Sequence, residues 1–148
     1  MRIHRLVAAL VGAALALTTA ACGETVTSNG PPTIAIVAKA FQRQFWQAVK
    51  QGAEQEAARQ NVRAPFEGPA TEADVEGQIR MLTNVLARRP AAIGFAALDP
   101  QAAAPLLEQA QQRDIPVNAF DSGVDSDLPL TTAATDNNAA AEAAQDRE

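Results

Sequence analysis

The sequence predicts an α/β fold, a doubly wound parallel sheet with helices on both faces. Two observations predict it. Short runs rich in Ile, Val and Ala alternate along the chain with longer stretches in which apolar residues recur at helical spacing. The short runs are apolar throughout, which is typical of strands that are buried on both faces. Strands and helices that alternate in this way form right-handed units around a parallel sheet.

Five strands are expected, and each is followed by a turn signal or a polar residue. The first, residues 33–38, reads Thr-Ile-Ala-Ile-Val-Ala. The second, 62–67, is weaker and ends at Gly68-Pro69, which is a turn signal. The other three are expected at 91–98, 115–120 and 130–134.

A first helix is expected at 44–60, because one stripe at helical spacing is formed by Phe45, Val49, Gly52, Ala53 and Ala57. We therefore predict that Phe45 faces the core. Trp46, next to it, is predicted to point elsewhere and is the better candidate for a ligand contact. Both aromatic residues stand close to the end of the first strand, where a ligand is expected.

Three further helices follow. Thr71 and Asp74 fit a capping box, and the helix that they open ends before Pro90; its apolar stripe is Val75, Ile79, Leu82 and Leu86. The next helix begins at Asp99-Pro100, with Pro in the first turn, and its inward residues are expected to be Ala103, Leu106, Leu107 and Ala110. An Ala-rich helix is expected from residue 138 onward.

Residues 1–21 have the organisation of an export signal and are left out of the fold. Arg2, His4 and Arg5 form a short positive region, and the apolar run at 6–17 has 12 residues, too few to span a bilayer. The sequence Thr-Ala-Ala-Cys at 19–22 then resembles the lipobox of bacterial lipoproteins, with Thr where Leu is usual.

We predict that residues 1–21 are a lipoprotein signal peptide and that Cys22 is lipidated. The protein is then exported and anchored by lipid to the membrane, at the periplasmic or cell-surface face of the plasma membrane. The alternative is ordinary secretion, with cleavage near Ala21 and Cys22 left as a free thiol. Residues 22–32 are polar, contain Gly and Pro, and are predicted to be a flexible tether.

The charge and the missing residue types exclude several functions. Loss of residues 1–21 removes two arginines, so 10 basic side chains remain against 17 acidic ones, a net charge of −7. Such a chain lacks the basic surface of nucleic-acid-binding proteins. The only histidine, His4, and the only cysteine, Cys22, lie outside the folded body, and there is no tyrosine. Ser-His-Asp or Cys-His catalysis and His-containing metal sites are therefore excluded within this segment.

Motifs for nucleotide binding are also missing. No GxGxxG follows the first strand, and GxxxxGK[ST] occurs nowhere in the chain. Asp121-Ser122-Gly123 does not match the GxSxG pattern of a nucleophile. We therefore predict a binding protein rather than an enzyme, with no cofactor and no metal.

Polar side chains are expected to gather where the strands end, the usual ligand site of open parallel sheets. The residues in question are Lys39, Glu67, Asp99, Asp121 and the pair Asp136-Asn137, with Phe45 and Trp46 nearby. Carboxylates accept hydrogen bonds from hydroxyl groups, and an aromatic face covers the C–H side of a sugar ring, so this set suits a polyhydroxylated ligand. Asp99 and Asp136 could instead be helix caps. For Asp121 a functional role is favoured, because no helix clearly begins after it.

Three segments resemble the ribose-type periplasmic sugar-binding proteins. They are Ala-Ile-Val-Ala-Lys at 35–39 through Phe45-Trp46 and on to Gly52-Ala53; Asp114-Ile-Pro-Val117 with Asp121; and Thr135-Asp-Asn137. The resemblance covers about residues 33–145, in the family's order. Two departures are Arg43-Gln44, where the family has Asn-Pro, and Ser122, where it often has an Arg that clamps hydroxyl groups.

The resemblance implies two Rossmann-like α/β lobes, the type I periplasmic binding fold, joined by a hinge and closing on one ligand. Residues 33–137 correspond to the N-terminal lobe, and 138–148 to the start of the first helix of a second lobe that is missing. It also implies roles for single residues: Phe45 and Trp46 sandwich the sugar and Asp121 takes ring hydroxyls. Lys39, Arg43 and Asp99 then lie at the rim, and Asn137 stands at the crossing.

The leading hypothesis is a solute-binding component of an ABC-type importer, with a sugar as ligand and an ABC permease as partner. The alternatives are a lobe that presents a ligand to a membrane receptor and, with less support, a fragment of an exported α/β enzyme. A LacI-type regulator would need a basic DNA-binding segment where the signal peptide stands. A single lobe is expected to be weakly stable and to bind weakly.

Overall fold

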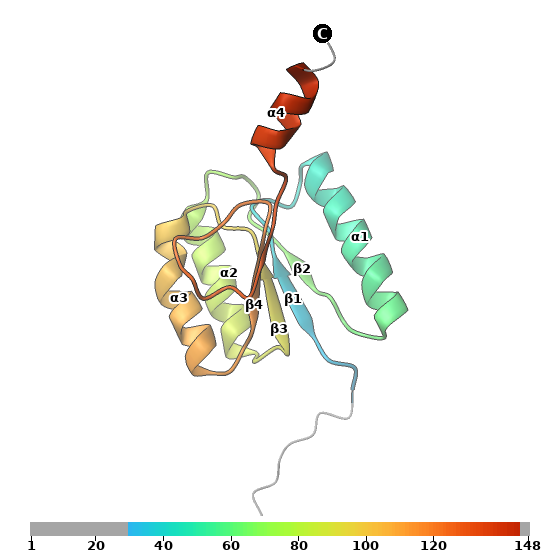
Figure 1. Ribbon diagram of the computed structural model, residues 1–148. Helices are drawn as coiled ribbons and strands as arrows, with labels where there is room; N and C mark the ends of the chain where they lie inside the picture. Colours follow the sequence, from blue (N-terminus) through green and yellow to red (C-terminus); the bar gives the residue numbers. More distant parts are fainter. Residues whose placement is uncertain (1–29, 146–148) are drawn as a thin grey trace, which may run out of the picture.

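The computed structural model describes residues 30–145 of the chain (Figure 1). The predicted signal peptide, Cys22 and most of the predicted tether lie outside this range. None of the helices within it is long and apolar enough to cross a membrane.

The centre of the fold is a five-stranded sheet in which every pair of neighbours is parallel, as predicted. In chain order the strands are β1 (Ile34–Val37), β2 (Phe66–Glu67), β3 (Ala92–Phe95), β4 (Val117–Phe120) and β5 (Thr132–Ala133). Their order in space is β2-β1-β3-β4-β5. Val37, Phe95 and Ala119 are partners in register, so that β1, β3 and β4 place one row of apolar side chains on the same face.

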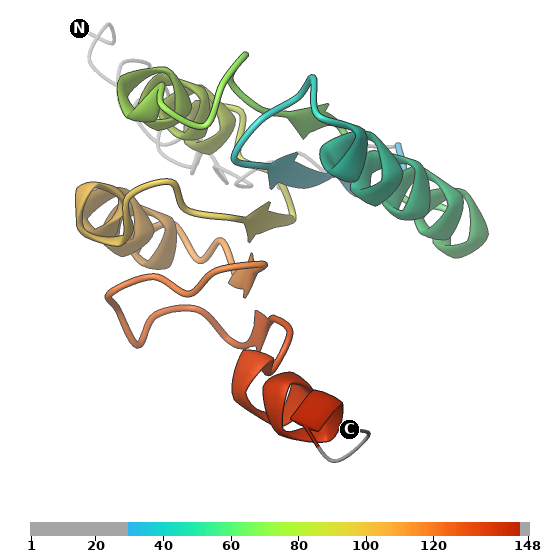
Figure 2. The same cartoon turned by 90° about the horizontal axis from the view of Figure 1, so that it is seen from above.

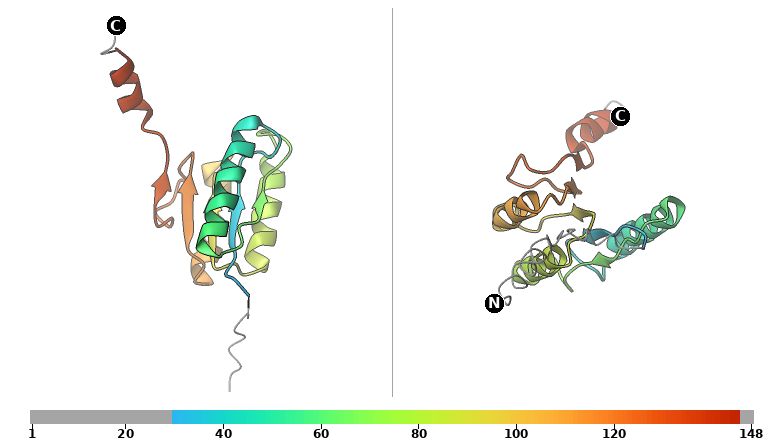
Figure 3. Two further views of the ribbon diagram at one scale, coloured as in Figure 1. Left: turned by 90° about the vertical axis from the view of Figure 1, so that its right-hand side faces the viewer. Right: turned by 90° about the horizontal axis from the view of Figure 1, so that it is seen from below.

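Helices cover both faces of this sheet (Figure 2). Helix α2 (Val75–Ala87) and helix α3 (Pro100–Gln112) pack on one face, and α1 (Gln44–Gln60) lies on the other. Four of the predicted inward residues of α2 and α3 are confirmed as almost fully buried. Leu82, Leu86, Leu107 and Ala110 are at most 1% exposed. Helix α4 (Asn137–Gln145) projects beyond the carboxyl end of the sheet (Figures 1 and 3).

The predicted inward face of α1 is confirmed at Val49, Ala53 and Ala57 but is wrong at Phe45 and Gly52. Trp46 is only 2% exposed, whereas Phe45 is 56% exposed and Gly52 is exposed as well. The inward stripe is Trp46, Val49, Ala53 and Ala57, which also has helical spacing. The helix turns this stripe inward because the indole is its largest apolar group and gains most from leaving water.

The predicted bounds of several elements also need correction. Strands β3, β4 and β5 are each shorter than the predicted 91–98, 115–120 and 130–134, and β2 and α2 begin later than predicted. Strand β2 begins only at Phe66, because Val62 ends the turn after α1 by donating its N–H to the carbonyl of Ala57 at 3.0 Å, and Pro65 has no N–H to give. Helix α2 is capped by Asp74, whose side chain accepts a hydrogen bond from the Gly77 N–H at 2.8 Å. Asp74 is therefore the N-cap itself, and the helix begins one turn later than the predicted capping box.

Candidate ligand-binding site

The carboxyl ends of β1 and β4 bring Lys39 and Asp121 together. Lys39 follows β1 by two residues, and Asp121 comes directly after β4. The Lys39 Nζ lies 2.7 Å from the Asp121 Oδ2, although β3 stands between the two strands in the sheet. The two side chains keep 21% and 31% of their surface exposed. A cation and a carboxylate are thus paired at the rim and remain open to a ligand.

The backbone holds Asp121 firmly in this position. Its φ of 62° lies in the left-handed region, which is uncommon for a residue other than glycine. Its N–H donates to the carbonyl of Ala133 at 2.9 Å, which ties the end of β4 to β5. The next residue, Ser122, donates its hydroxyl to the carbonyl of Ala97 at 3.0 Å. This side chain therefore links the β4 and β3 loops, and the Arg that the family often has at this place is replaced by a structural contact.

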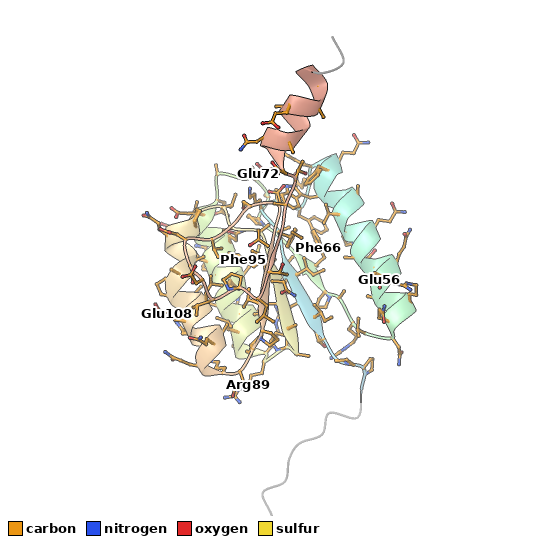
Figure 4. All side chains as sticks on the ribbon, in the orientation of Figure 1. Glu56, Phe66, Glu72, Arg89, Phe95 and Glu108 are labelled. Carbon is orange, nitrogen blue, oxygen red and sulfur yellow. The ribbon has the colours of Figure 1, made fainter. Side chains whose placement is uncertain are left out.

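Phe45 and Trp46 take opposite roles from those predicted. The Phe45 ring is exposed at the rim and meets the Trp46 ring edge to face, with centroids 4.9 Å apart and an angle of 80°. Trp46 lies behind it, 6.2 Å from the ring of Phe120, and its Nε1 donates to Glu72 at 3.0 Å. Figure 4 shows Glu72 at the carboxyl end of the sheet. In this lobe Phe45 is the aromatic face that a ligand can reach, and Trp46 supports it.

A shallow groove runs beside these residues. It has a volume of about 520 Å³ and is lined by Phe45, Phe120, Asp121, Ala133, Ala134 and Thr135. One wall is aromatic, another carries a carboxylate, and the floor is formed by small residues that follow β5. This composition suits a small ligand with both apolar and hydroxylated sides.

The other predicted rim residues are less free to bind. Asp99 caps α3, since its Oδ1 accepts from the N–H groups of Gln101 and Ala102 at 2.9 and 3.0 Å. Asp136 caps α4 in the same way, which confirms the alternative that the sequence left open for both. Glu67 is turned away from the rim and pairs with Arg88 at 2.5 Å.

Arg43 and Asn137 remain candidates. Arg43 is exposed, and its Nε lies 3.7 Å from the carboxylate of Glu72, the same group that holds Trp46. Asn137 opens α4, and its side chain lies outside the part of the chain that the structure describes. Among the described residues no cluster of three or more His, Cys, Asp or Glu side chains could hold a metal ion.

One residue of the site region was missed by the sequence reasoning. Gln78 of α2 is 1% exposed, and its amide donates to the carbonyls of Ala38 and Ala96 at 2.9 and 2.8 Å. Its Oε1 accepts from the Leu98 N–H at 2.9 Å. The amide thereby joins the two loops that carry Lys39 and Asp99. A signal was present, because Gln78 is a polar residue on the apolar stripe of a predicted helix.

Comparison with known proteins identifies the family of the chain and supports its fold. A family model described as a periplasmic binding protein domain matches residues 34–146. The chain belongs to this family. The predicted resemblance and fold are therefore confirmed, and the prediction of a binding protein rather than an enzyme agrees with the family. A search of curated proteins finds no match.

Solved structures of similar proteins include four with at least 30% identity, of which three are described here. An ABC transporter, LacI family transcriptional regulator from Brachyspira murdochii has 37% identity and a TM-score of 0.73, over 79% of this chain and 38% of that one. A carbohydrate transporter solute-binding protein from Agrobacterium radiobacter, in complex with D-arabinose, has 32% identity and a TM-score of 0.67, over 80% and 40%. An ABC transporter solute-binding protein from Agrobacterium vitis, with bound D-fucose, has 34% identity and a TM-score of 0.71, over 78% and 41%. The chain thus spans about two fifths of the length of these structures.

Proposed function

We propose that this chain carries the N-terminal lobe of a solute-binding protein that delivers a sugar, or a similar polyhydroxylated molecule, to an ABC-type importer. The observation that carries the proposal is the Lys39–Asp121 pair beside the exposed ring of Phe45. Membership of the periplasmic binding protein family supports it, as do the two similar structures whose ligands are D-arabinose and D-fucose.

Each rim residue has a role that follows from its chemistry. The Asp121 carboxylate accepts hydrogen bonds from adjacent hydroxyl groups, and Lys39 donates to a ligand oxygen. Phe45 covers the C–H face of the ring. Trp46 contributes through Phe45, since it is buried behind it. Three groups complete the rim on the side that a second lobe closes. They are Arg43, Asn137 and the carboxylate oxygen of Asp99 that does not cap α3.

Calorimetric titration of the complete protein with a panel of pentoses and hexoses tests the proposal. We expect micromolar or tighter binding of at least one sugar. Asp121→Asn and Lys39→Met should each weaken it at least about tenfold, because hydrogen bonds to charged groups are worth about 1.5–3 kcal/mol. Asp127→Asn is the matched control, since Asp127 is exposed in the same loop as Asp121 and forms no ion pair within residues 30–145.

Two results would contradict the proposal. One is that no sugar binds in the micromolar range. The other is that Asp127→Asn weakens binding as much as Asp121→Asn, because the effect would then come from net charge rather than from the rim. Co-purification with the permease, with and without the sugar, tests the importer itself.

We also propose export of the chain with a lipid anchor at Cys22. The family is periplasmic, and the signal-like segment ends at the only cysteine. Mass spectrometry of the mature N-terminus should show diacylglycerol on Cys22. In Cys22→Ser the protein should be released from the membrane fraction, and a protein that stays there unchanged would contradict the anchor.

A further inference from the structure

The end of the sheet opposite the candidate site is rich in arginine. In a parallel sheet every helix returns the chain to the amino ends of the strands, so the segments that follow α1, α2 and α3 lie together there. Those segments carry Arg63, Arg88, Arg89 and Arg113. Arg63, Arg88 and Arg89 line one hollow of about 850 Å³ together with Pro31 and Pro32. Figure 4 shows Arg89 at this end, far from Glu72.

The predicted tether enters the fold between these arginines. The Arg63 N–H donates to the carbonyl of Pro32 at 2.8 Å, and the Ile34 N–H donates back to the carbonyl of Arg63 at 2.8 Å. On the other side, the Ala91 N–H donates to the carbonyl of Thr33 at 2.8 Å. Residues 31–33 are therefore held between the segment of Arg63 and the segment of Arg89. A chain that leads to Cys22 leaves the lobe at this basic surface.

Only one of these four arginines, Arg88, forms an ion pair within the described residues. It pairs with Glu67, whereas Arg113 donates to the neutral carbonyl of Leu86 at 3.1 Å. Arg63 and Arg89 are exposed and form no ion pair within residues 30–145. The carboxylates toward this end are Glu56, which is paired with Arg59; Glu67, which is paired with Arg88; Asp114; and Glu108 in the second half of α3. The opposite end carries a larger set of carboxylates, namely Glu72, Asp74, Glu76, Asp99, Asp121 and Asp136, together with the cations Lys39 and Arg43. Charge is thus separated along the strands in a chain that is acidic as a whole.

Local backbone geometry does not account for Arg89. Its φ is 49°, in the left-handed region, at the position after a helix where glycine or asparagine is favoured. The residues in the same conformation after α1 and α3 are Asn61 and Asp114, which tolerate it better than most. The left-handed conformation at this position disfavours an arginine. The presence of Arg89 is therefore not explained by the backbone, and its positive charge is the property left to explain.

We propose that Arg63, Arg88 and Arg89 form a docking surface for the anionic phospholipid headgroups of the membrane to which the tether leads. The inference rests on the export and the anchor proposed above. Because residues 31–33 are held in the fold, the free tether is residues 22–30, and these nine residues reach at most about 32 Å when extended. Surface charges act over only about 8–10 Å at physiological salt, so the anchor alone does not keep the lobe within reach of the membrane charge. Docking therefore holds the lobe on the bilayer and turns its acidic rim, with the ligand site, away from it.

Vesicle sedimentation tests this surface. The chain without residues 1–21 and with Cys22→Ser carries no acyl group. It is mixed with vesicles of phosphatidylcholine alone or of phosphatidylcholine with 30 mol% phosphatidylglycerol. At roughly the charge density of the second composition, one arginine raises the partition coefficient about fivefold. We expect binding to the anionic vesicles only, and release in high salt. Arg63→Gln with Arg89→Gln should lower the partition coefficient about 25-fold. Lys50→Gln with Arg80→Gln removes the same charge from elsewhere and should have little effect.

Three outcomes would overturn the proposal: no preference for anionic vesicles, equal losses in the two double variants, or displacement by millimolar inorganic phosphate, which would assign the hollow to a free anion. Circular dichroism of both double variants excludes unfolding as the cause. The result is independent of the calorimetry with sugars, because neither arginine lies near the rim. A protein that binds no sugar but docks on vesicles, or the reverse, separates the two proposals.

Discussion

The face of the sheet beneath α2 and α3 buries a continuous core, whereas the face beneath α1 has a smaller one. On the first face the cluster includes Val37, Phe95 and Val117 from three strands, together with the leucines of both helices. On the second, the buried cluster consists of Trp46, Phe66 and three alanines. Ile36 and Phe120 pack against it but stay partly exposed, and Ile34 is 37% exposed.

This difference bears on function. Phe45 and Asp121, the proposed ligand contacts, adjoin Trp46 of the smaller cluster and Phe120, which packs against it. The site is therefore built on the face with less buried apolar area, while the larger core on the other face supplies most of the hydrophobic stabilisation. We expect substitutions on the two faces to separate stability from binding.

The largest effect is expected from a matched pair of phenylalanines. Phe95→Ala removes a fully buried ring from the larger core and should lower the free energy of unfolding by about 3–5 kcal/mol. Phe120→Ala removes the same ring from the smaller cluster, where it is partly exposed, and should cost less than about 2 kcal/mol. Urea denaturation with an unchanged slope measures both values. Equal losses would show that the face beneath α1 contributes as much as the other.

Gln78 connects the two faces of the sheet. Its substitution should have the second largest effect on the free energy of unfolding. It belongs to α2, but its amide satisfies the carbonyls of Ala38 and Ala96, which are part of the smaller cluster. Gln78→Leu leaves these carbonyls and the Leu98 N–H without partners, at a cost of about 3 kcal/mol in the free energy of unfolding. It should also weaken ligand binding, because the loop of Lys39 loses its support. Gln55→Leu, on the exposed side of α1, should change stability by less than about 0.5 kcal/mol. A Gln78 variant as stable as the Gln55 variant would refute this role.

The same two faces show what the sequence could and could not predict. The stripes of α2 and α3 are unambiguous, and Leu82, Leu86 and Leu107 are buried as expected. In α1 either Phe45 or Trp46 could begin the stripe that continues with Val49, Ala53 and Ala57, and only the packing of Trp46 decides between the two aromatic residues. The parallel sheet follows from local alternation and right-handed connections, whereas the strand order comes only from the structure.

The candidate site was predictable as a list but not as an arrangement. Parallel strands bring Lys39 and Asp121 to the same edge, yet their pairing over the end of β3 depends on strand order and on the left-handed backbone of Asp121. The capping roles of Asp99 and Asp136 were visible as alternatives, because short-range contacts depend on neighbours in the chain. Gln78 makes contacts 18 to 40 residues away, and such contacts leave no local pattern except a polar residue on an apolar stripe.

The smallest effect is expected on the solvent side of α1. Hydrogen bonds from Arg59 and then from Gln60 hold the pKa of Glu56 below its usual 4.5. A carboxylate with a lowered pKa in the folded state stabilises the fold above its unfolded pKa, and this contribution is lost as the pH falls through the lowered value. Because Glu56 is fully exposed, solvent screens the pair and the stability change should be barely measurable.

Arg59→Gln should return the NMR titration midpoint of Glu56 towards 4.5, and Gln60→Ala should move it less, since Arg59 is the larger cause. An unchanged midpoint in Arg59→Gln would contradict the assignment. A marked loss of stability in the same variant would show that exposed pairs on α1 compensate for the small core beneath it. The two faces would then differ in the size of their buried cores but not in their total contribution to stability.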